Sequence, residues 1–293
     1  MKEKKIPFSI LHNWSSGRDF LKKGMSLSHQ KIKKAGLSKD FLDGKIDAKK
    51  EISLPLNLMN SKEISPFYLE NPMEIIMEDE NILALNKLPG IHSHPLNYDE
   101  TNNCLSFIRN IGKGDILYIN RDSRDRGLLY RLDYETSGVL VYIKKQELFE
   151  KLRKNFHQAI RHKRYVALIS GKHHLTGEFA HNLNASGRKG GFMKASEGDK
   201  AVMRIKNCHY LDFCDLSIVE IFLKTGFRHQ IRSQLAALGM PVLGDVLYGG
   251  EKSYRMFLHA FYYEICWGDN LYKIKCMNAP LFDKFFKLND YLS

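Results

Sequence analysis

The chain has 293 residues, of which 43% are hydrophobic and 27% are charged. This composition is typical of a folded globular protein and excludes a disordered chain or a small scaffold held by disulfides. The longest apolar runs, such as 139–143, are far shorter than the roughly 18 residues that a membrane-spanning helix needs. Because the first residues lack the apolar core of a secretory signal, we expect the protein to stay in the cytoplasm, away from membranes.

The cysteines and the missing motifs exclude several classes of enzyme. Five cysteines are spread along the chain without a Cys-x-x-Cys pair, which indicates reduced, mostly buried thiols and no zinc site. The chain has no Walker loop, no His-Glu-x-x-His pattern and no Gly-x-Ser-x-Gly elbow. We therefore expect a function that needs no cofactor and no metal.

The charge of the chain is strongly positive and unevenly spread. Lys and Arg number 45 against 33 Asp and Glu, a net charge of +12. Residues 1–60 hold 13 basic and 6 acidic residues, and residues 151–206 hold 13 basic and 3 acidic residues. Two basic regions indicate a polyanion that the chain contacts at two places.

Composition also divides the chain into parts. Residues 1–60 are rich in lysine and poor in apolar residues, which indicates a small module. Residues 61–72 contain Ser, Asn and Pro and have the composition of a linker. From residue 73 to residue 293 the chain has the patterns of one larger domain.

The patterns within these parts predict an α+β protein. In the module, helical patterns cover 19–27 and 28–35, and a hairpin-like stretch covers 41–52. In the main domain, many strands at hairpin spacing and few helices predict a mixed, largely antiparallel sheet with flanking helices, in place of a doubly wound parallel sheet. The strands are expected at 75–78, 82–86, 139–144, 164–170, 201–210, 216–223 and 262–267, and the helices at 147–157 and 229–238.

Three polar segments interrupt the apolar strands and are candidates for a functional site. Asp133 directly precedes the apolar strand 139–143, where its carboxylate would stand at the mouth of the sheet, although a turn that only caps the strand has the same pattern. Tyr165 alternates with buried positions of a strand, as a core tyrosine also would. Arg232 lies near the start of a helix, either at the surface or turned inward to neutralise a buried carboxylate.

Five segments in this order resemble the motifs of the RluA-type RNA pseudouridine synthases, and the resemblance covers about residues 73–290. The residues that carry it are Arg131-Leu132-Asp133 with Thr136-Ser137-Gly138, 163–171 around Tyr165, 225–232 with Leu235, 239–249, and Leu258-His259-Ala260. The N-terminal module resembles, chiefly in 24–36 and 43–52, the S4-type RNA-binding domain that this family shares with a ribosomal protein.

The resemblance implies the catalytic fold of that family, an isomerase activity and an Asp nucleophile. Asp133 would attack the uridine, and Arg232 would pair with Asp133 and keep it ionised. Tyr165 would stack on the uracil ring and help to remove the proton from C5. The target uridine would be flipped out of its RNA helix. Seven further residues would contact the substrate or the RNA around it: Arg131, Leu132, Thr136, Ile231, Arg161, Lys163 and Arg164.

Some positions depart from the family pattern, and some alternatives stay open. Tyr130 stands where the family usually has His, and Phe227 stands where it usually has Arg, which concerns the choice of RNA more than the reaction. We expect a monomer that acts on RNA, with large-subunit ribosomal RNA preferred over transfer RNA. The alternatives are a non-catalytic RNA-binding factor of ribosome assembly on the same fold, and another carboxylate enzyme, such as a glycosidase, in which Glu135 would be the second acid.

Overall fold

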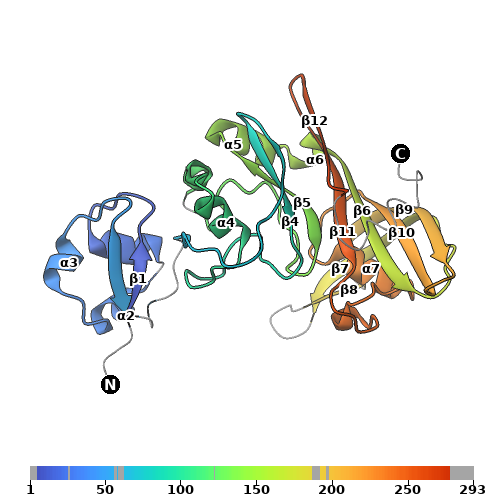
Figure 1. Cartoon of the computed structure of the whole chain (residues 1–293), viewed down its shortest axis with the longest axis horizontal. Coiled ribbons are helices and arrows are strands. Elements are labelled where there is room, and N and C mark those ends of the chain that lie inside the picture. The colour runs from blue at the N-terminus through green and yellow to red at the C-terminus, as the bar shows by residue number, and fades with distance from the viewer. Residues whose placement is uncertain are drawn as a thin grey trace. The chain divides into compact units, whose positions relative to one another are not determined.

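The computed structural model describes residues 5–25, 27–55, 58, 63–121, 123–186, 192–195 and 198–277, and Figure 1 shows its ribbon. The chain divides into two compact units. The first consists of Met1–Pro72, His92–Leu128 and Tyr142–Phe149, and the second of Met73–Ile91, Leu129–Val141 and Glu150–Ser293.

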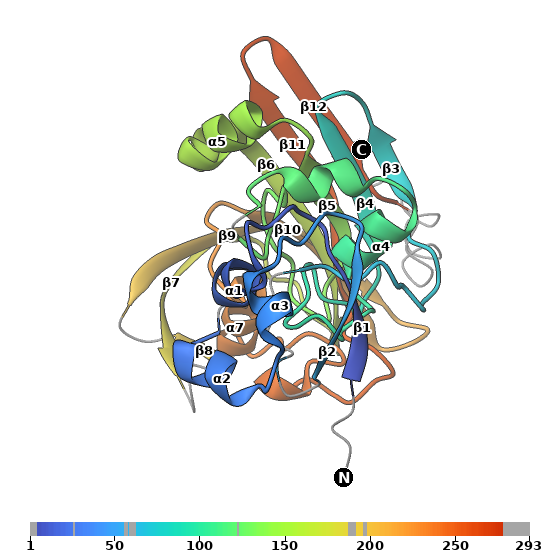
Figure 2. The ribbon, with the colours of Figure 1, turned by 90° about the vertical axis from the view of Figure 1, so that its left-hand side faces the viewer.

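The first unit begins with a two-stranded antiparallel sheet and short helices, which Figure 2 shows facing the viewer. Strand β1 (Lys5–Ser9) pairs with β2 (Glu51–Pro55), so that Phe8 lies opposite Ile52. The helical turns between these strands are α1 (Gly17–Asp19), the π-wound turn Phe20–Gly24, α2 (His29–Lys34) and α3 (Lys39–Asp43). The predicted helix at 28–35 is confirmed as α2, whereas the one at 19–27 forms as two shorter turns.

The stretch 41–52 is not the hairpin that its Asp43-Gly44 pair predicted. The Ser38 hydroxyl accepts a hydrogen bond from the Phe41 N–H at 3.2 Å and caps the start of α3. The Gly44 N–H donates to the Asp40 carbonyl at 2.9 Å and closes the last turn. Asp43-Gly44 therefore ends a helix and does not turn a hairpin.

The core of the N-terminal elements includes an aromatic residue from much later in the chain. Phe8 and Phe20 are fully buried among apolar side chains, and Tyr98 stacks on Phe8 with ring centroids 3.6 Å apart. The Tyr98 hydroxyl accepts a hydrogen bond from the Ser9 N–H at 2.7 Å, and Arg109 donates to the Ser9 hydroxyl at 2.8 Å. Tyr98 thus belongs to the core of residues 1–60, and Arg109 is hydrogen-bonded to them. The expected domain boundaries at 60 and 72 stay a prediction.

Two further helical segments complete the first unit as the structure describes it. Helix α4 (Cys104–Asn110) is capped by Asn103, whose side-chain oxygen accepts a hydrogen bond from the Ser106 N–H at 2.9 Å. A 3₁₀ turn, Gly114–Tyr118, follows α4. Near the start of the expected linker, Glu63 is buried and accepts a hydrogen bond from the Leu11 N–H at 3.0 Å. Because burial disfavours the charged form, the pKa of Glu63 is raised.

The described part of the chain forms one large sheet around which the second unit is built. Ten strands take the order β3-β4-β5-β11-β6-β10-β9-β7-β8, with β12 paired to β11. Their bounds are β3 (Ile75–Glu78), β4 (Ile82–Lys87), β5 (Ser137–Ile143), β6 (Ile160–Ser170), β7 (Gly177–Ser186), β8 (Phe192–Ala195), β9 (Asp199–Leu211), β10 (Leu216–Leu223), β11 (Leu258–Trp267) and β12 (Asn270–Lys275). Helices α5 (Gln146–Lys154), α6 (Phe156–Ala159) and α7 (Gln230–Ala237) and the 3₁₀ turn Val246–Tyr248 accompany the sheet.

This topology confirms the predicted α+β class. Seven strand pairs of this sheet are antiparallel, whereas β5 runs parallel to β11, where Ser137 lies opposite His259. The strands predicted at 75–78 and 216–223 are confirmed with those bounds as β3 and β10. The helix predicted at 147–157 is interrupted and forms as α5 and α6.

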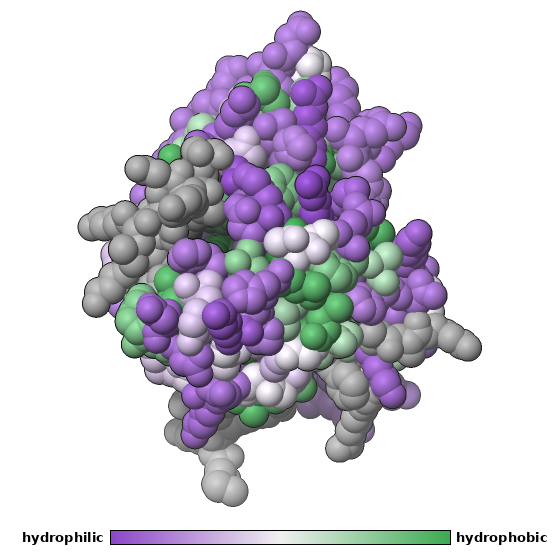
Figure 3. All heavy atoms as spheres, turned by 90° about the vertical axis from the view of Figure 1, so that its right-hand side faces the viewer, coloured by the Kyte–Doolittle hydropathy of each residue, from purple (hydrophilic) through white to green (hydrophobic). Residues whose placement is uncertain are grey.

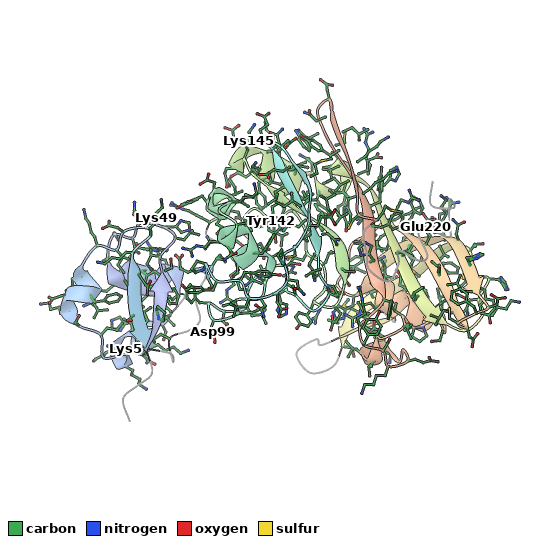
Figure 4. The ribbon with its side chains drawn as sticks, in the orientation of Figure 1. Lys5, Lys49, Asp99, Tyr142, Lys145 and Glu220 are labelled. Carbon is green, nitrogen blue, oxygen red and sulfur yellow. The ribbon has the colours of Figure 1, made fainter. Side chains whose placement is uncertain are left out.

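The surface and the helices bear on possible partners. None of the helices in the described ranges has the length and apolarity to cross a membrane. One face of the molecule, shown in Figure 3, carries hydrophilic side chains over most of its area and an apolar area in its middle. In the N-terminal elements the charges point outward: Lys5 and Lys49, labelled in Figure 4, are both exposed.

Candidate active site

Asp133 lies in a tight turn that directly precedes β5. The Thr136 N–H donates to the Asp133 carbonyl at 3.2 Å and closes the turn. The Tyr134 carbonyl accepts hydrogen bonds from the Gly90 N–H at 2.9 Å and from the buried Lys87 ammonium at 3.1 Å. The backbone of the turn is therefore fixed from two sides, and the Asp133 side chain stays 24% exposed at its tip.

Gly138 lets this turn enter the sheet beside β11. Its φ of +114° lies in a region that favours glycine. A Cβ atom at this position would meet the backbone of Ala260 at 2.2 Å, which is closer than any side chain permits. The Thr136-Ser137-Gly138 sequence therefore allows β5 to approach β11 closely, and this approach sets the position of the turn.

Arg232 is the cation of the site, and three carboxylates lie close to its guanidinium. It projects from α7 with its side chain only 3% exposed and binds Asp245 through two hydrogen bonds of 2.7 and 2.8 Å. Its Nη1 lies 3.4 Å from the Asp133 carboxylate and 3.5 Å from that of Glu135. Burial opposes the charge of Arg232, but the hydrogen bonds and charges of these carboxylates raise its pKa overall.

Asp245 is thus a site residue for which the sequence analysis assigned no role. Its carboxylate is 1% exposed and forms a forked pair with Arg232, the geometry in which a guanidinium binds a carboxylate most strongly. Asp245 stands within the fourth of the motifs that carry the family resemblance, so a signal for it was present. The spacing alone did not show that Asp245 and Asp133 share one arginine.

Tyr165 is buried in a cluster with two other tyrosines. Its hydroxyl forms a short hydrogen bond with the Tyr263 hydroxyl, and Tyr263 stacks on Tyr130 with ring centroids 4.3 Å apart. Burial, together with the nearby negative charge of Asp133, raises the pKa of Tyr165. The phenol is therefore neutral at neutral pH. Tyr130, which departs from the family pattern, is a buried stacking partner in this cluster.

Comparisons with known proteins place the chain in a family. The model of the RNA pseudouridylate synthase family matches residues 81–237, which is more than half of the chain. The chain belongs to this family. It is 30% identical over 231 residues to the ribosomal large subunit pseudouridine synthase D of Borreliella burgdorferi, a match that covers 76% of this chain and 70% of that protein. The ribosomal large subunit pseudouridine synthase C of Rickettsia bellii is 33% identical, over 68% of this chain and 64% of its own length.

A solved structure supports the fold as well. The human RNA pseudouridylate synthase domain containing 1 has a TM-score of 0.58 and 21% sequence identity, over 72% of this chain and 86% of its own. The predicted fold and the predicted membership of the RluA-type pseudouridine synthases are confirmed. The enzyme class is confirmed with them, namely an isomerase that converts uridine to pseudouridine in RNA.

The other predicted substrate contacts of this pseudouridylate synthase divide into buried and exposed groups. The side chains of Leu132, Thr136 and Ile231 are buried, so they form part of the packing that surrounds the site. Arg131 and Arg161 are exposed, as residues that reach RNA must be. The positions of these five residues agree with the expected roles, which stay predictions.

Lys163 and Arg164 are placed differently from the expectation that both reach RNA phosphates. The Lys163 side chain is buried, and its ammonium donates to the Thr225 carbonyl at 2.6 Å. Arg164 binds Glu220 at 2.6 Å, and its guanidinium lies over the ring of Phe261 at 4.9 Å. Glu220, labelled in Figure 4, is itself buried on β10. Both basic side chains therefore have partners within the sheet domain, and their contacts with RNA stay a prediction.

Burial of Lys163 predicts a pH-dependent contribution to stability. Desolvation lowers the pKa of Lys163 from 10.5 to about 8. Between pH 8 and 10.5 the unfolded chain holds a proton that the folded chain has released, so the free energy of unfolding rises with pH in this window. The wild-type protein should gain up to about 3 kcal/mol relative to the Lys163→Met variant between pH 7 and 10.5, measured by denaturant unfolding.

The Lys273→Met variant is the control, because it removes the same charge at an exposed position. A Lys163→Met difference that is the same at pH 7 and at pH 10.5 would show that Lys163 keeps an ordinary pKa in the folded state.

Proposed function

We propose that this enzyme converts specific uridines of large-subunit ribosomal RNA to pseudouridine, with Asp133 as its nucleophile. The observation that supports this assignment most strongly is the partly open carboxylate of Asp133, 3.4 Å from the buried guanidinium of Arg232. A nucleophilic carboxylate has to be ionised, and a cation at this distance favours the ionised form. The relatives named as ribosomal large subunit pseudouridine synthases support the choice of RNA.

The reaction requires no atoms other than those of the uridine. The bond between uracil N1 and ribose C1′ breaks, C5 becomes bonded to C1′, the proton on C5 leaves, and N1 takes up a proton, so that the product is an isomer of the substrate. Asp133 starts this sequence by attack at C1′ or at C6 of the base, and it is released again when the new bond has formed. Arg232 lies beside the carboxylate before attack and after release and balances its charge.

Tyr165 acts in this proposal through its ring and not as a base. Its raised pKa leaves no phenolate at neutral pH to take the C5 proton. The hydrogen bond to Tyr263 fixes the ring on which the flipped uracil would stack. Another acceptor, such as water or the released Asp133 carboxylate, takes the C5 proton.

RNA binding in this proposal depends on the two basic regions. Flipping a uridine out of a helix costs a few kcal/mol, which contacts with phosphates offset. Within 151–206 the described Lys and Arg residues other than Lys163 and Arg164 are exposed, and some of this region lies outside the described residues. On α2, Lys31, Lys33 and Lys34 are exposed as well.

Mapping every pseudouridine in cellular RNA tests the proposed target. The comparison is between the source organism with the wild-type gene and the same organism with Asp133→Asn. Loss of one or a few sites in large-subunit ribosomal RNA supports the proposal, whereas loss of sites in transfer RNA assigns the enzyme to that substrate. An unchanged map, with RNA binding intact, would favour a non-catalytic RNA-binding factor.

The lysines of α2 should affect RNA affinity but not chemistry. Replacing Lys31 and Lys33 with Ser should weaken RNA binding and lower the slope of log affinity against log salt by about 0.7 to 0.9 for each phosphate that the protein no longer neutralises. Filter binding at several salt concentrations measures this slope. Substitution suits this test better than deletion, because removal of residues 1–60 would uncover Tyr98.

The paired variant Lys273→Ser/Lys275→Ser removes the same charge from β12 and is the matched control. If both double variants lower the slope equally, the N-terminal module has no particular role in binding RNA.

A further inference from the structure

His229 stands next to the proposed nucleophile in an unusual backbone conformation. It directly precedes α7 with φ +50° and ψ +22°, in the left-handed region that residues other than glycine seldom adopt. Its side chain makes no capping hydrogen bond to the helix. A strained residue that does not cap its helix needs another reason for its conformation.

The imidazole of His229 lies between Tyr248 and Asp133. Its Nδ1 is 3.0 Å from the Tyr248 hydroxyl, and its Nε2 is 3.9 Å from Oδ1 of Asp133. The Tyr248 hydroxyl already accepts a hydrogen bond from the Met193 N–H at 2.7 Å. Its own proton can be donated to Nδ1, and the ring proton then lies on Nε2, on the side that faces Asp133.

The two oxygens of the Asp133 carboxylate therefore face two different donors. Arg232 approaches Oδ2 at 3.4 Å and His229 approaches Oδ1 at 3.9 Å. Arg232 gives its two shortest hydrogen bonds to Asp245 and only a longer contact to Asp133. The nucleophile is thus held less tightly by the arginine than a dedicated ion pair would hold it.

We propose that His229 is a positioning residue for the nucleophile: its Nε2–H, oriented by Tyr248, holds the Asp133 carboxylate in the rotamer that attacks the uridine. This inference rests on the proposed role of Asp133. This role accounts for the strained backbone of His229, because that conformation brings the ring to 3.9 Å from Asp133.

The surroundings of His229 favour a neutral ring. Burial is the largest effect and lowers its pKa, and Arg232 and Arg228 act in the same direction, whereas Asp133 and Glu135 act against it. Tyr248 is the remaining titratable group against the ring, and burial raises its pKa. A neutral imidazole orients the carboxylate through one N–H without adding a second full charge that would weaken the nucleophile.

Tritium release from RNA measures the effect on chemistry. The substrate is total RNA labelled with [5-³H]uracil in cells that lack this enzyme, so that both ribosomal and transfer RNA are present. His229→Leu should lower the single-turnover rate of release by roughly 10- to 100-fold. The Kd for the same RNA should change less than twofold. His229→Gln keeps an N–H donor near the Nε2 position and should stay within about fivefold of wild type.

Two further variants separate orientation from folding. Tyr248→Phe removes the hydroxyl that orients the ring and should give an intermediate rate. His229→Gly relieves the backbone strain, so it should melt no lower than wild type and still be as slow as His229→Leu. This variant keeps the test valid if His229→Leu fails to fold.

The outcomes distinguish the inference from the function on which it rests. Equal rates for wild type, His229→Leu and His229→Gly would overturn the positioning role while leaving the synthase intact. Equally slow His229→Gln and His229→Leu would also overturn it, because the packing of the ring and not its N–H would then matter. If the wild-type enzyme releases no tritium from this RNA, the proposed function fails and the inference fails with it.

Discussion

Asp133→Asn should reduce the single-turnover rate of pseudouridine formation by roughly 10⁴-fold or more, because an amide cannot replace a carboxylate nucleophile. The side chain keeps its shape, and its position in the turn depends on backbone hydrogen bonds that the substitution leaves in place. The melting temperature should therefore change little. RNA affinity should also be retained, since contacts with phosphates lie elsewhere. Single-turnover tritium release and filter binding on the same preparation measure both quantities.

Glu135→Gln is the matched control for Asp133→Asn. Glu135 also lies near Arg232, at 3.5 Å, but its side chain is 46% exposed and it follows Asp133 by only two residues. The control removes the same charge from the same arginine and should retain activity within about tenfold. A larger loss in Glu135→Gln than in Asp133→Asn would identify Glu135 as the essential carboxylate and overturn the assignment of Asp133.

The sequence predicted the elements with strong patterns and missed those without them. Strands β3 and β10 were expected with their observed bounds because β-branched residues and turn signals delimit them. Strand β7 was missed because it is largely exposed, with Leu183 its one fully buried described residue, and its many polar residues give no apolar alternation. The Asp43-Gly44 pair misled because helix ends and hairpin turns both use such residues.

The site could be predicted as a set of residues but not as a set of contacts. Asp133, Tyr165 and Arg232 were named from motifs, and the structure brings Asp133 and Arg232 together. The main partner of Arg232 is nevertheless Asp245, which reaches it through the loop after α7. Which of several acids approaches a given arginine depends on that loop, and no local pattern encodes it. His229 escaped notice for the same reason.

The inward placement of Lys163 and Arg164 has a related cause. Both lie on β6, which is paired on both sides by β11 and β10. A basic run on an edge strand or loop would face solvent, whereas on a central strand it has to find carbonyls, carboxylates or aromatic faces. The sequence showed the charge of this segment, but the strand order was needed to show where the charge points.

Arg232→Met should destabilise the fold by about 3–5 kcal/mol, because it leaves a buried carboxylate without its partner. The carboxylate in question is that of Asp245, 1% exposed and bound twice by Arg232, and not that of Asp133, which is open to solvent. Denaturant unfolding measures the destabilisation. The exposed Arg228→Met variant is the control and should change the free energy of unfolding by less than about 0.5 kcal/mol.

The double variant Arg232→Met/Asp245→Leu separates the stabilising role of Arg232 from its role in chemistry. Removing both partners leaves no unpaired buried charge, so the double variant should recover at least half of the stability that Arg232→Met loses. Turnover should not recover, because Asp133 still lacks the guanidinium that lies 3.4 Å from its carboxylate. If the double variant is as unstable as Arg232→Met, Asp245 is not the group that Arg232 neutralises. If it regains activity along with stability, Arg232 serves the fold alone, and Asp133 needs no guanidinium beside it for the reaction.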